Sequence, residues 1–384
     1  MNDCLDLLFE SDRGKDPALL AHKWERLQKS GFKFFRGSTK LFYHHWAKQS
    51  LPEAPIGWIC GDVHLENAGS FTGKNHVAYF DLSDFDEVCL APLHYDLGRA
   101  LTGLAMMKMG HFRRGFIAGY REALTEGKPY HVEPEVATGT VARLLTEIKQ
   151  RSRKKFLTQW IHKDRIIEKE GETFRLPVKQ RNRVARIFNS WAKNQPKPDF
   201  YHVLDICGSI SGVGSIGHER YLVLVAGKKL PHLIDMKEAG PASAAEISGI
   251  PQPIWENEAE RVATVQFFMQ YLPIARLGWT KSSFVLSEFQ STEDRIDCLS
   301  LSEEEYDNFI RQWGRLVAWA HLRCTGWRST ATTDVLIEYG KSLTVDRQEK
   351  IIRASSQSAD YLMRAFNTYR DYWTKYLEPG AAAK

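Results

Sequence analysis

Apolar residues recur at helical spacing over most of this 384-residue chain. The first such pattern covers about residues 17–30 and stops before Gly31, and an aromatic-rich helix is expected over 32–46. Further helical patterns cover residues 111–200, 255–272 and 306–324, and helix is expected from there to about residue 377. Most of the chain is therefore expected to be helical.

Residues 201–290 follow a different pattern. Period-two patterning appears in YHVLDICGSI, the β-branched and apolar ERYLVLV and the segment LPHLIDMKEA read as two more strands, and SFVLSEF at 283–289 predicts a further strand. A chain of this length usually forms more than one lobe. We therefore expect an α+β protein with a large helical lobe and a small antiparallel β lobe. An N-terminal helical segment, residues 1–57, is expected to pack on the large lobe, whose first section covers residues 58–200. The β lobe covers residues 201–290, and residues 291–384 return as helices to the large lobe.

The stretch from Trp58 to Asp86 concentrates polar side chains between apolar runs. A buried strand is expected to end at Cys60, and Gly61 then starts a polar loop. A turn at residues 72–75 returns the chain through a second apolar strand toward more carboxylates. The polar residues are Asp62, His64, Asn67, Asp81, Asp84 and Asp86. Carboxylates and an amide oxygen that converge in this way suit Mg²⁺, which takes oxygen ligands and keeps several waters.

Asp96 lies at the start of the next expected helix. A buried aspartate in this position is usually a structural cap, and here we expect it to tie the polar loop to the helix. His64 is expected to orient the loop through a ring N–H. Arg36 is expected either to pack beneath the loop or to point at a phosphate.

A glycine-rich segment separates the first two strands of the β lobe. Gly212, Gly214 and Gly217, with Val213 and Ser215 between them, fit GxGxxG, which occurs both in dinucleotide sites and in loops that cover nucleotide phosphates. The segment is followed by a strand rather than a helix, which favours the phosphate-covering loop.

The third strand of the β lobe carries Lys237 after an apolar run, as expected for a lysine that binds α- and β-phosphates. Glu260, in the following helix, is the expected ion-pair partner of Lys237. Glu288, near the end of the 283–289 strand, is also expected to contribute to the nucleotide site.

Composition and charge narrow the class of protein. Hydrophobic residues make up 43% of the chain, and the net charge is only +5, which does not indicate a dedicated nucleic-acid binder. The six cysteines are scattered without a CxxC motif, which favours reduced thiols in the cytoplasm. No signal peptide and no apolar run long enough to span a membrane is recognised.

These motifs resemble those of known families. Gly61-Asp62-x-His64-x-x-Asn67 is similar to the HGDxHxxN loop of aminoglycoside and choline kinase-like phosphotransferases, with Cys60 in place of the first His. Asp84-Phe85-Asp86 resembles their metal-binding IDF or IDW motif. Over nearly the whole chain, the FFRG, GDxHLxN, FDxNDFDE, WDLxR, GVGSxGxRxY and KEA segments of the uncharacterised bacterial family DUF2252 have counterparts here.

The order of the parts is unusual for a kinase, because the catalytic loop precedes the glycine loop. Cutting a kinase before its catalytic loop and joining its ends gives this order, so we expect a circularly permuted protein kinase-like fold. The helix over 313–324 would then pack beside the catalytic loop.

The resemblance implies an ATP- and Mg²⁺-dependent phosphotransferase. By this resemblance, Asp62 accepts or orients the proton of the acceptor hydroxyl, and Asn67 with Asp84 binds the metal. Lys237 binds the α- and β-phosphates, and Glu260 positions Lys237. The backbone of Gly212–Gly217 covers the nucleotide. Asp81 is the alternative metal ligand. Asp84 is preferred because its spacing to Asp96 fits the motif better.

Three other functions remain open. A nucleotide-binding regulator would keep the fold without turnover, and a kinase-like enzyme could transfer AMP instead of phosphate. A metal-dependent phosphoesterase also uses GDxH, but the chain lacks GDxxDR-like and GNHE-like segments. The hydroxyl acceptor cannot be identified, because the helical segments 111–200 and 327–378 carry no transferable signature.

Overall fold

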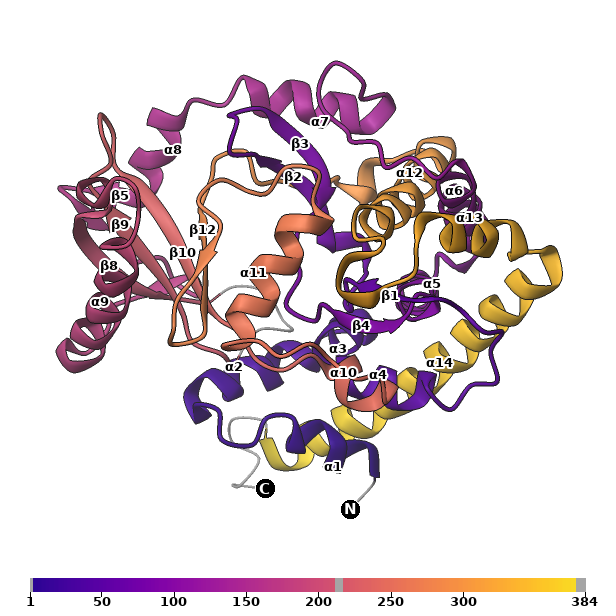
Figure 1. Cartoon of the computed structure of the whole chain (residues 1–384). Helices are drawn as coiled ribbons and strands as arrows, with labels where there is room; N and C mark the ends of the chain where they lie inside the picture. The colour runs from indigo at the N-terminus through magenta and orange to yellow at the C-terminus, as the bar shows by residue number, and fades with distance from the viewer. Residues whose placement is uncertain (1–2, 211–216, 378–384) are drawn as a thin grey trace.

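The computed structural model describes residues 3–210 and 217–377. It confirms an α+β protein with antiparallel sheets (Figure 1). A helical body occupies one side of the molecule, and a twisted sheet occupies the other. Among the described residues, no helix combines the length and the apolar character that a membrane crossing requires.

The helical body is built around α12, Glu303–Arg323, which packs on α6, Arg113–Glu126. Ser302 and Glu305 form a capping box at the start of α12. The two helices approach closely because each has a glycine at the contact. A Cβ on Gly119 would lie 2.0 Å from the Arg311 carbonyl oxygen, and one on Gly314 would lie 2.1 Å from that of Phe116. This body is completed by α5, His94–Met106, and by two C-terminal helices, α13, Thr333–Ser342, and α14, Val345–Tyr372.

Four short helices at the N-terminus pack against the helical body. These are α1 to α4, at Asp3–Glu10, Pro17–Leu27, Gly31–Gly37 and Thr39–Trp46. Helix α4 contacts both α14 and α5. The predicted helical patterns over residues 17–30 and 32–46 are therefore confirmed, with a break at Ser38.

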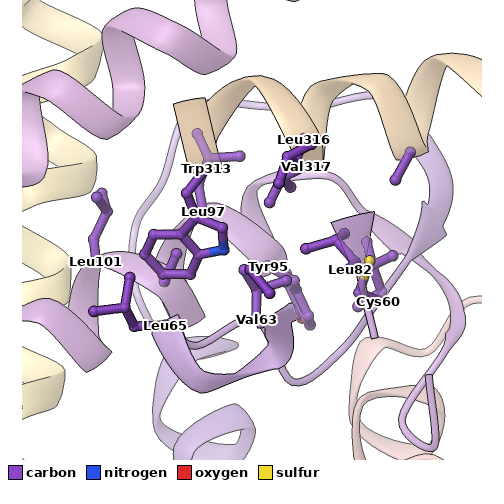
Figure 2. Packing of buried hydrophobic residues seen from close by; sticks show 14 of the residues in the cluster. Cys60, Val63, Leu65, Leu82, Tyr95, Leu97, Leu101, Trp313, Leu316 and Val317 are labelled. Carbon is purple, nitrogen blue, oxygen red and sulfur yellow. The ribbon is translucent and has the colours of Figure 1, made fainter. Parts of the chain in front are cut away.

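Two small antiparallel ladders follow. Strand β1, Ile56–Ile59, pairs with β4, Cys89–Pro92, and strand β2, Ala68–Thr72, pairs with β3, Ala78–Leu82. Apolar side chains of the loop after β1 pack toward α12 (Figure 2). Val63 and Leu65 of this loop belong to the same buried cluster as Trp313 and Leu316 of α12. The expected packing of the 313–324 helix beside the polar loop is thus observed.

The six-stranded sheet has the order β11-β12-β10-β9-β8-β7 with antiparallel neighbours. In chain order, its strands are β7 Thr173–Phe174, β8 Val203–Ser209, β9 Arg220–Val225, β10 His232–Glu238, β11 Gly278–Trp279 and β12 Phe284–Glu288. The four strands predicted over residues 201–290 are confirmed as β8, β9, β10 and β12.

One face of this sheet is covered by α9, Val178–Ala192, through Val184 and Phe188. Strand β7 and helix α9 precede the expected boundary at residue 201, yet they pack on the sheet. An amphipathic pattern shows that a helix needs an apolar partner, but it does not identify which partner. The opposite face contacts α8, Arg153–Trp160, and the short strands β5, Ile161–His162, and β6, Arg165–Ile166.

Helix α11, Glu258–Met269, lies between the sheet and the helical body (Figure 1). The remaining helices are α7, Gly139–Lys149, which runs toward α8, and α10, Ser243–Ser248, which follows β10. The expected helix over residues 255–272 is confirmed in this place as α11.

Candidate functional site

The polar loop begins where β1 ends, and Gly61 allows its sharp turn. Gly61 has a φ of +79°, and a Cβ at this position would lie 2.1 Å from the Glu87 carbonyl oxygen. Only glycine fits both conditions. The chain then presents Asp62 on the polar side, while Val63 and Leu65 enter the core.

Asp96 of α5 anchors this loop, as predicted. Its carboxylate accepts hydrogen bonds from the backbone N–H groups of Cys60 at 2.7 Å and Gly61 at 2.9 Å. His321 of α12 lies 3.0 Å from the same carboxylate through Nε2, and the Tyr120 hydroxyl lies 2.9 Å from its Nδ1. Asp96 is fully buried. The loop is therefore fixed to two long helices by satisfied, buried polar groups.

Asp62 is held by an arginine that has no role in the sequence prediction. The fully buried Arg99 donates from Nε to Asp62 Oδ1 at 2.9 Å, and its guanidinium lies over the Phe35 ring at 3.6 Å. Burial raises the pKa of Asp62, although Arg99 opposes this shift. The second oxygen, Oδ2, is 3.6 Å from His64 Nε2.

His64 supports the loop differently from the prediction. Its Nε2 accepts a hydrogen bond from Arg36 Nε at 3.2 Å, so the ring acts as an acceptor toward Arg36. Burial lowers the pKa of His64 well below its usual value, which keeps the ring neutral. Arg36 also forms an ion pair with Glu66.

Lys237 of β10 lies beside the carboxylates that follow β3. Its Nζ is 3.6 Å from Asp84 Oδ1 and forms a closer ion pair with Asp86. Burial would raise the pKa of Asp84, but Lys237, the Asp86 backbone N–H and Arg220 together lower it below its usual value. Burial and the neighbouring Asp84 raise the pKa of Asp86. Residues far apart in the sequence thus form one charge cluster, as the expected site requires.

A cleft of about 430 Å³ surrounds this cluster. We call it the Lys237 cleft. Its walls come from the inner face of the sheet, from α11 and from the segment after β3, and they include Asp84, Asp86, Arg220, Asp235, Lys237 and Gln266. Arg220 Nε donates to Asp235 Oδ1 at 2.7 Å. This pair was not predicted, and it makes the sheet side of the cleft polar.

The two candidate metal ligands, Asp84 and Asp81, differ in their access to the cleft. Asp84 lines it with 39% of its side chain exposed, whereas Asp81 has 4% exposed and is bound by Arg323 at 2.8 Å. Asn67 donates from Nδ2 to the Asp62 carbonyl oxygen at 2.7 Å, an arrangement that uses its nitrogen and leaves Oδ1 as the candidate ligand atom.

The donor set suits a metal that is shared with a ligand. Over residues 3–210 and 217–377, no group of three or more His, Cys, Asp or Glu side chains is placed to hold an ion alone. Mg²⁺ commonly uses one or two carboxylates together with substrate phosphates and water. Asn67 and Asp84 fit this second kind of site.

Sequence comparison matches residues 13–372 to the family described as "Uncharacterized protein conserved in bacteria (DUF2252)". The chain belongs to the DUF2252 family. Searches of curated proteins and of solved structures found no match.

Glu260 of this DUF2252 chain does not contact Lys237. Its carboxylate accepts a hydrogen bond from the Glu256 backbone N–H at 2.6 Å, at the start of α11. The neighbouring Arg261 points toward the site instead and donates to the backbone carbonyl oxygens of Val88, Asp86 and Gly240. Successive helical residues point about 100° apart, so one position decides which side chain faces the site.

Glu288 lies on the other face of the sheet from Lys237. In the β10–β12 register it stands opposite Ile234, while Val285 stands opposite Lys237. Its carboxylate interacts with His232, and Arg276 lies 3.3 Å from it. These contacts hold Glu288 outside the Lys237 cleft.

The glycine-rich segment is only partly described. Gly212, Val213, Gly214 and Ser215 lie outside the described residues. Gly217 has a φ of +109°, and a Cβ there would lie 2.9 Å from the Lys15 side chain. The end of this segment is therefore packed against the N-terminal region.

Proposed function

We propose that this protein is an ATP- and Mg²⁺-dependent phosphotransferase that moves the γ-phosphoryl group to a hydroxyl acceptor. One observation carries the proposal. Lys237 from the sheet meets Asp84 and Asp86 in a cleft of ligand size. Ser83, in the cleft wall, donates from its backbone N–H to the Asn67 carbonyl oxygen at 2.9 Å, which joins the cleft to the loop that carries Asp62 and Asn67. A lysine, a metal-binding carboxylate and a catalytic-loop aspartate are the groups that phosphoryl transfer requires.

Each group has a defined role in this proposal. Lys237 binds the α- and β-phosphates, and Asn67 with Asp84 would hold Mg²⁺, which neutralises charge on the β- and γ-phosphates. The acceptor oxygen forms a bond to the γ-phosphorus while the bond to the β–γ bridging oxygen breaks, so ADP leaves. Asp62 receives the hydroxyl proton on Oδ2, because Arg99 occupies Oδ1.

A circularly permuted kinase-like arrangement accounts for the order of these parts. It is supported by the contact between α12 and the loop, since His321 binds Asp96, which binds Gly61. It is also supported by the antiparallel β8, β9 and β10, because the glycine-rich segment joins the first two and Lys237 lies on the third.

A nucleotide-binding regulator without turnover is the second candidate. The observation that favours it is the close bond from the buried Arg99 to Asp62, which offsets part of the rise in the pKa of Asp62 that burial causes.

The test measures ATP affinity and phosphoryl transfer, with and without Mg²⁺, for wild type, Lys237→Ala and Asp62→Asn. Lys228→Ala, in the exposed turn between β9 and β10, is the matched control. We expect Lys237→Ala to weaken ATP binding by about tenfold or more, because it removes a charge-assisted contact to phosphate. Asp62→Asn should retain binding and lose transfer.

Equal ATP affinity in wild type and Lys237→Ala would refute the nucleotide site. ATP binding without transfer in the wild type would favour the regulator over the enzyme.

A further inference from the structure

The wall of the Lys237 cleft contains an arginine that the proposed function does not use. Arg36, in the last turn of α3, lines this cleft together with Lys237 and Asp84. Its side chain is 11% exposed, so protein encloses most of it and a small part reaches the cleft. For Arg36 the sequence predicts either packing beneath the loop or a contact to a phosphate. Its place in the wall makes it available to a ligand of the cleft.

The backbone that carries Arg36 is fixed relative to Asp62. Arg99 donates from Nη2 to the carbonyl oxygen of Phe35, the residue before Arg36, at 2.8 Å. The same guanidinium donates from Nε to Asp62 Oδ1 at 2.9 Å, and Arg99 is fully buried. One buried group therefore holds both Arg36 and the aspartate that is proposed to receive the hydroxyl proton.

The loop that carries Asp62 also holds two of the three nitrogens of the Arg36 guanidinium. Nε donates to His64 Nε2 at 3.2 Å, and Nη1 binds Glu66. The third nitrogen, Nη2, has no hydrogen-bond partner among the described residues. A guanidinium is a rigid plane of N–H donors, so fixing two nitrogens also fixes the direction of the third. Arg36 thus has a free donor group with a preset orientation.

His64 places this guanidinium near the second oxygen of Asp62. His64 Nε2 lies 3.2 Å from Arg36 Nε and 3.6 Å from Asp62 Oδ2. Asp62 Oδ2 is the oxygen that Arg99 leaves free. Arg36 therefore combines two properties, a place in the wall of the Lys237 cleft and a position close to the free oxygen of Asp62.

The carboxylates near Arg36 do not depend on it for a positive partner. Asp62 pairs with Arg99 at 2.8 Å, and Glu66 pairs with Arg295 at 3.4 Å in addition to Arg36. Glu66 is also 41% exposed, so water screens its charge. Arg36 can therefore turn toward an anion in the cleft without leaving a buried carboxylate unpaired.

We infer that Arg36 binds the γ-phosphoryl group of the nucleotide during transfer. This inference rests on the proposed function and deepens it at the same site. With Lys237 on the α- and β-phosphates and Asp62 Oδ2 on the acceptor hydroxyl, the transferred group passes from the cleft toward Asp62, and Arg36 lies on this route.

The role of Arg36 in the step is to neutralise charge. The acceptor oxygen forms its bond to the γ-phosphorus as the bond to the β–γ bridging oxygen breaks, and ADP leaves. Arg36 would donate hydrogen bonds to a non-bridging γ-oxygen and keep all its protons, because a guanidinium does not deprotonate in proteins. Planar N–H donors bind phosphate oxygens strongly, and an arginine on the transferring group lowers the barrier of phosphoryl transfer.

The experiment measures the Kd of the full chain for ATP and for ADP with Mg²⁺ in wild type, Arg36→Gln and Arg36→Lys. ADP lacks the γ-phosphoryl group, so its affinity reports on the remainder of the site and on folding. We expect Arg36→Gln to weaken ATP binding by about tenfold or more and ADP binding by less than about twofold. Arg36→Lys keeps the charge without the fork and should bind ATP with intermediate affinity. Arg114→Gln, at a 64%-exposed arginine of α6, is the matched control and should bind both nucleotides as the wild type does.

The preference for ATP over ADP is the deciding quantity. An unchanged preference in Arg36→Gln would overturn the contact to the γ-phosphoryl group and leave the nucleotide site standing, whether affinity for both nucleotides falls together or neither changes. If Arg36→Gln does not fold, an unchanged preference in Arg36→Lys has the same meaning. Slower transfer with an unchanged preference would assign Arg36 to the acceptor and would also overturn the inference. Failure of the wild type to bind either nucleotide would overturn the proposed function itself.

Discussion

The Asp62 loop and the Lys237 cluster meet at one site, but they are held in different ways. The loop is fixed by fully buried partners, Asp96 and Arg99, whose bonds reach its backbone and its aspartate. In the cluster, Asp84 and Asp86 are 39% and 32% exposed, and their main partner is Lys237. Buried, hydrogen-bonded groups set a position, whereas partly exposed ion pairs contribute little to stability and can exchange partners with a ligand.

The largest effect is expected from breaking the anchor of the loop. Asp96→Ala removes the acceptor of two buried N–H groups and of His321. We expect a loss of about 3–5 kcal/mol in the free energy of unfolding, because these partners would remain buried and unpaired. Urea unfolding measures the change. Asp346→Ala is the control, because it breaks the ion pair between Lys350 and an Asp346 side chain that is 75% exposed. It should change the free energy of unfolding by less than about 0.5 kcal/mol. Similar losses in both variants would contradict the anchoring role.

A matched pair of aspartates gives the next effect. Asp81→Asn leaves Arg323 buried with a weakened partner, and we expect a loss of about 3 kcal/mol in stability. Asp84→Asn should cost less than about 1 kcal/mol, because its pair with Lys237 is partly exposed. Only Asp84→Asn should weaken the dependence of ATP binding on Mg²⁺. Unfolding curves and Mg²⁺ titrations with ATP measure both quantities, and a reversed pattern would identify Asp81 as the ligand.

The sequence predicts the parts of this site better than their contacts. Apolar and β-branched runs locate β9 and β10, and the kinase-like roles of Lys237 and Asp84 place them across one cleft. The helix-start position of Asp96 likewise predicts its role. These features depend on local pattern and spacing, which a single sequence contains.

Other features depend on the rotation of an element about its axis. A shift of one helical position separates Glu260, which bonds to the chain just before α11, from Arg261, which reaches the site. Along β12, side chains alternate between the two faces of the sheet, and Glu288 lies on the face opposite to that of Lys237. A single sequence does not fix these rotations, because the tertiary contacts that select them come from distant parts of the chain. The Asp81–Arg323 pair depends on the same kind of contact.

The pH dependence of stability tests Glu87, which lies beside the loop. Burial raises its pKa from the usual 4.5 to about 7. Between these values the folded protein binds more protons at Glu87 than the unfolded chain does, so the free energy of unfolding falls as the pH rises from about 4.5 to about 7. The contribution is at most about 3 kcal/mol.

Glu87→Gln should therefore flatten the decrease in stability across this pH range, as measured by thermal unfolding at several pH values. Some decrease should remain, because burial also raises the pKa of Glu293, in the Lys237 cleft, to about 7. Glu303→Gln, at the exposed start of α12, is the control and should keep the wild-type slope. An equal slope in wild type and Glu87→Gln would contradict the assignment to Glu87.

The smallest effect is expected at Glu260. Its substitution tests whether a carboxylate of α11 positions Lys237. Glu260→Gln retains an acceptor for the Glu256 N–H, so we expect less than about 0.5 kcal/mol change in stability and no measurable change in ATP affinity. Arg261→Gln is the matched variant, because it removes contacts to the backbone of Asp86 and Gly240 and should weaken ATP binding. A loss of ATP affinity in Glu260→Gln alone would mean that α11 turns during binding and brings Glu260 to Lys237. Unchanged affinity would leave Asp84 and Asp86 as the groups that position this lysine.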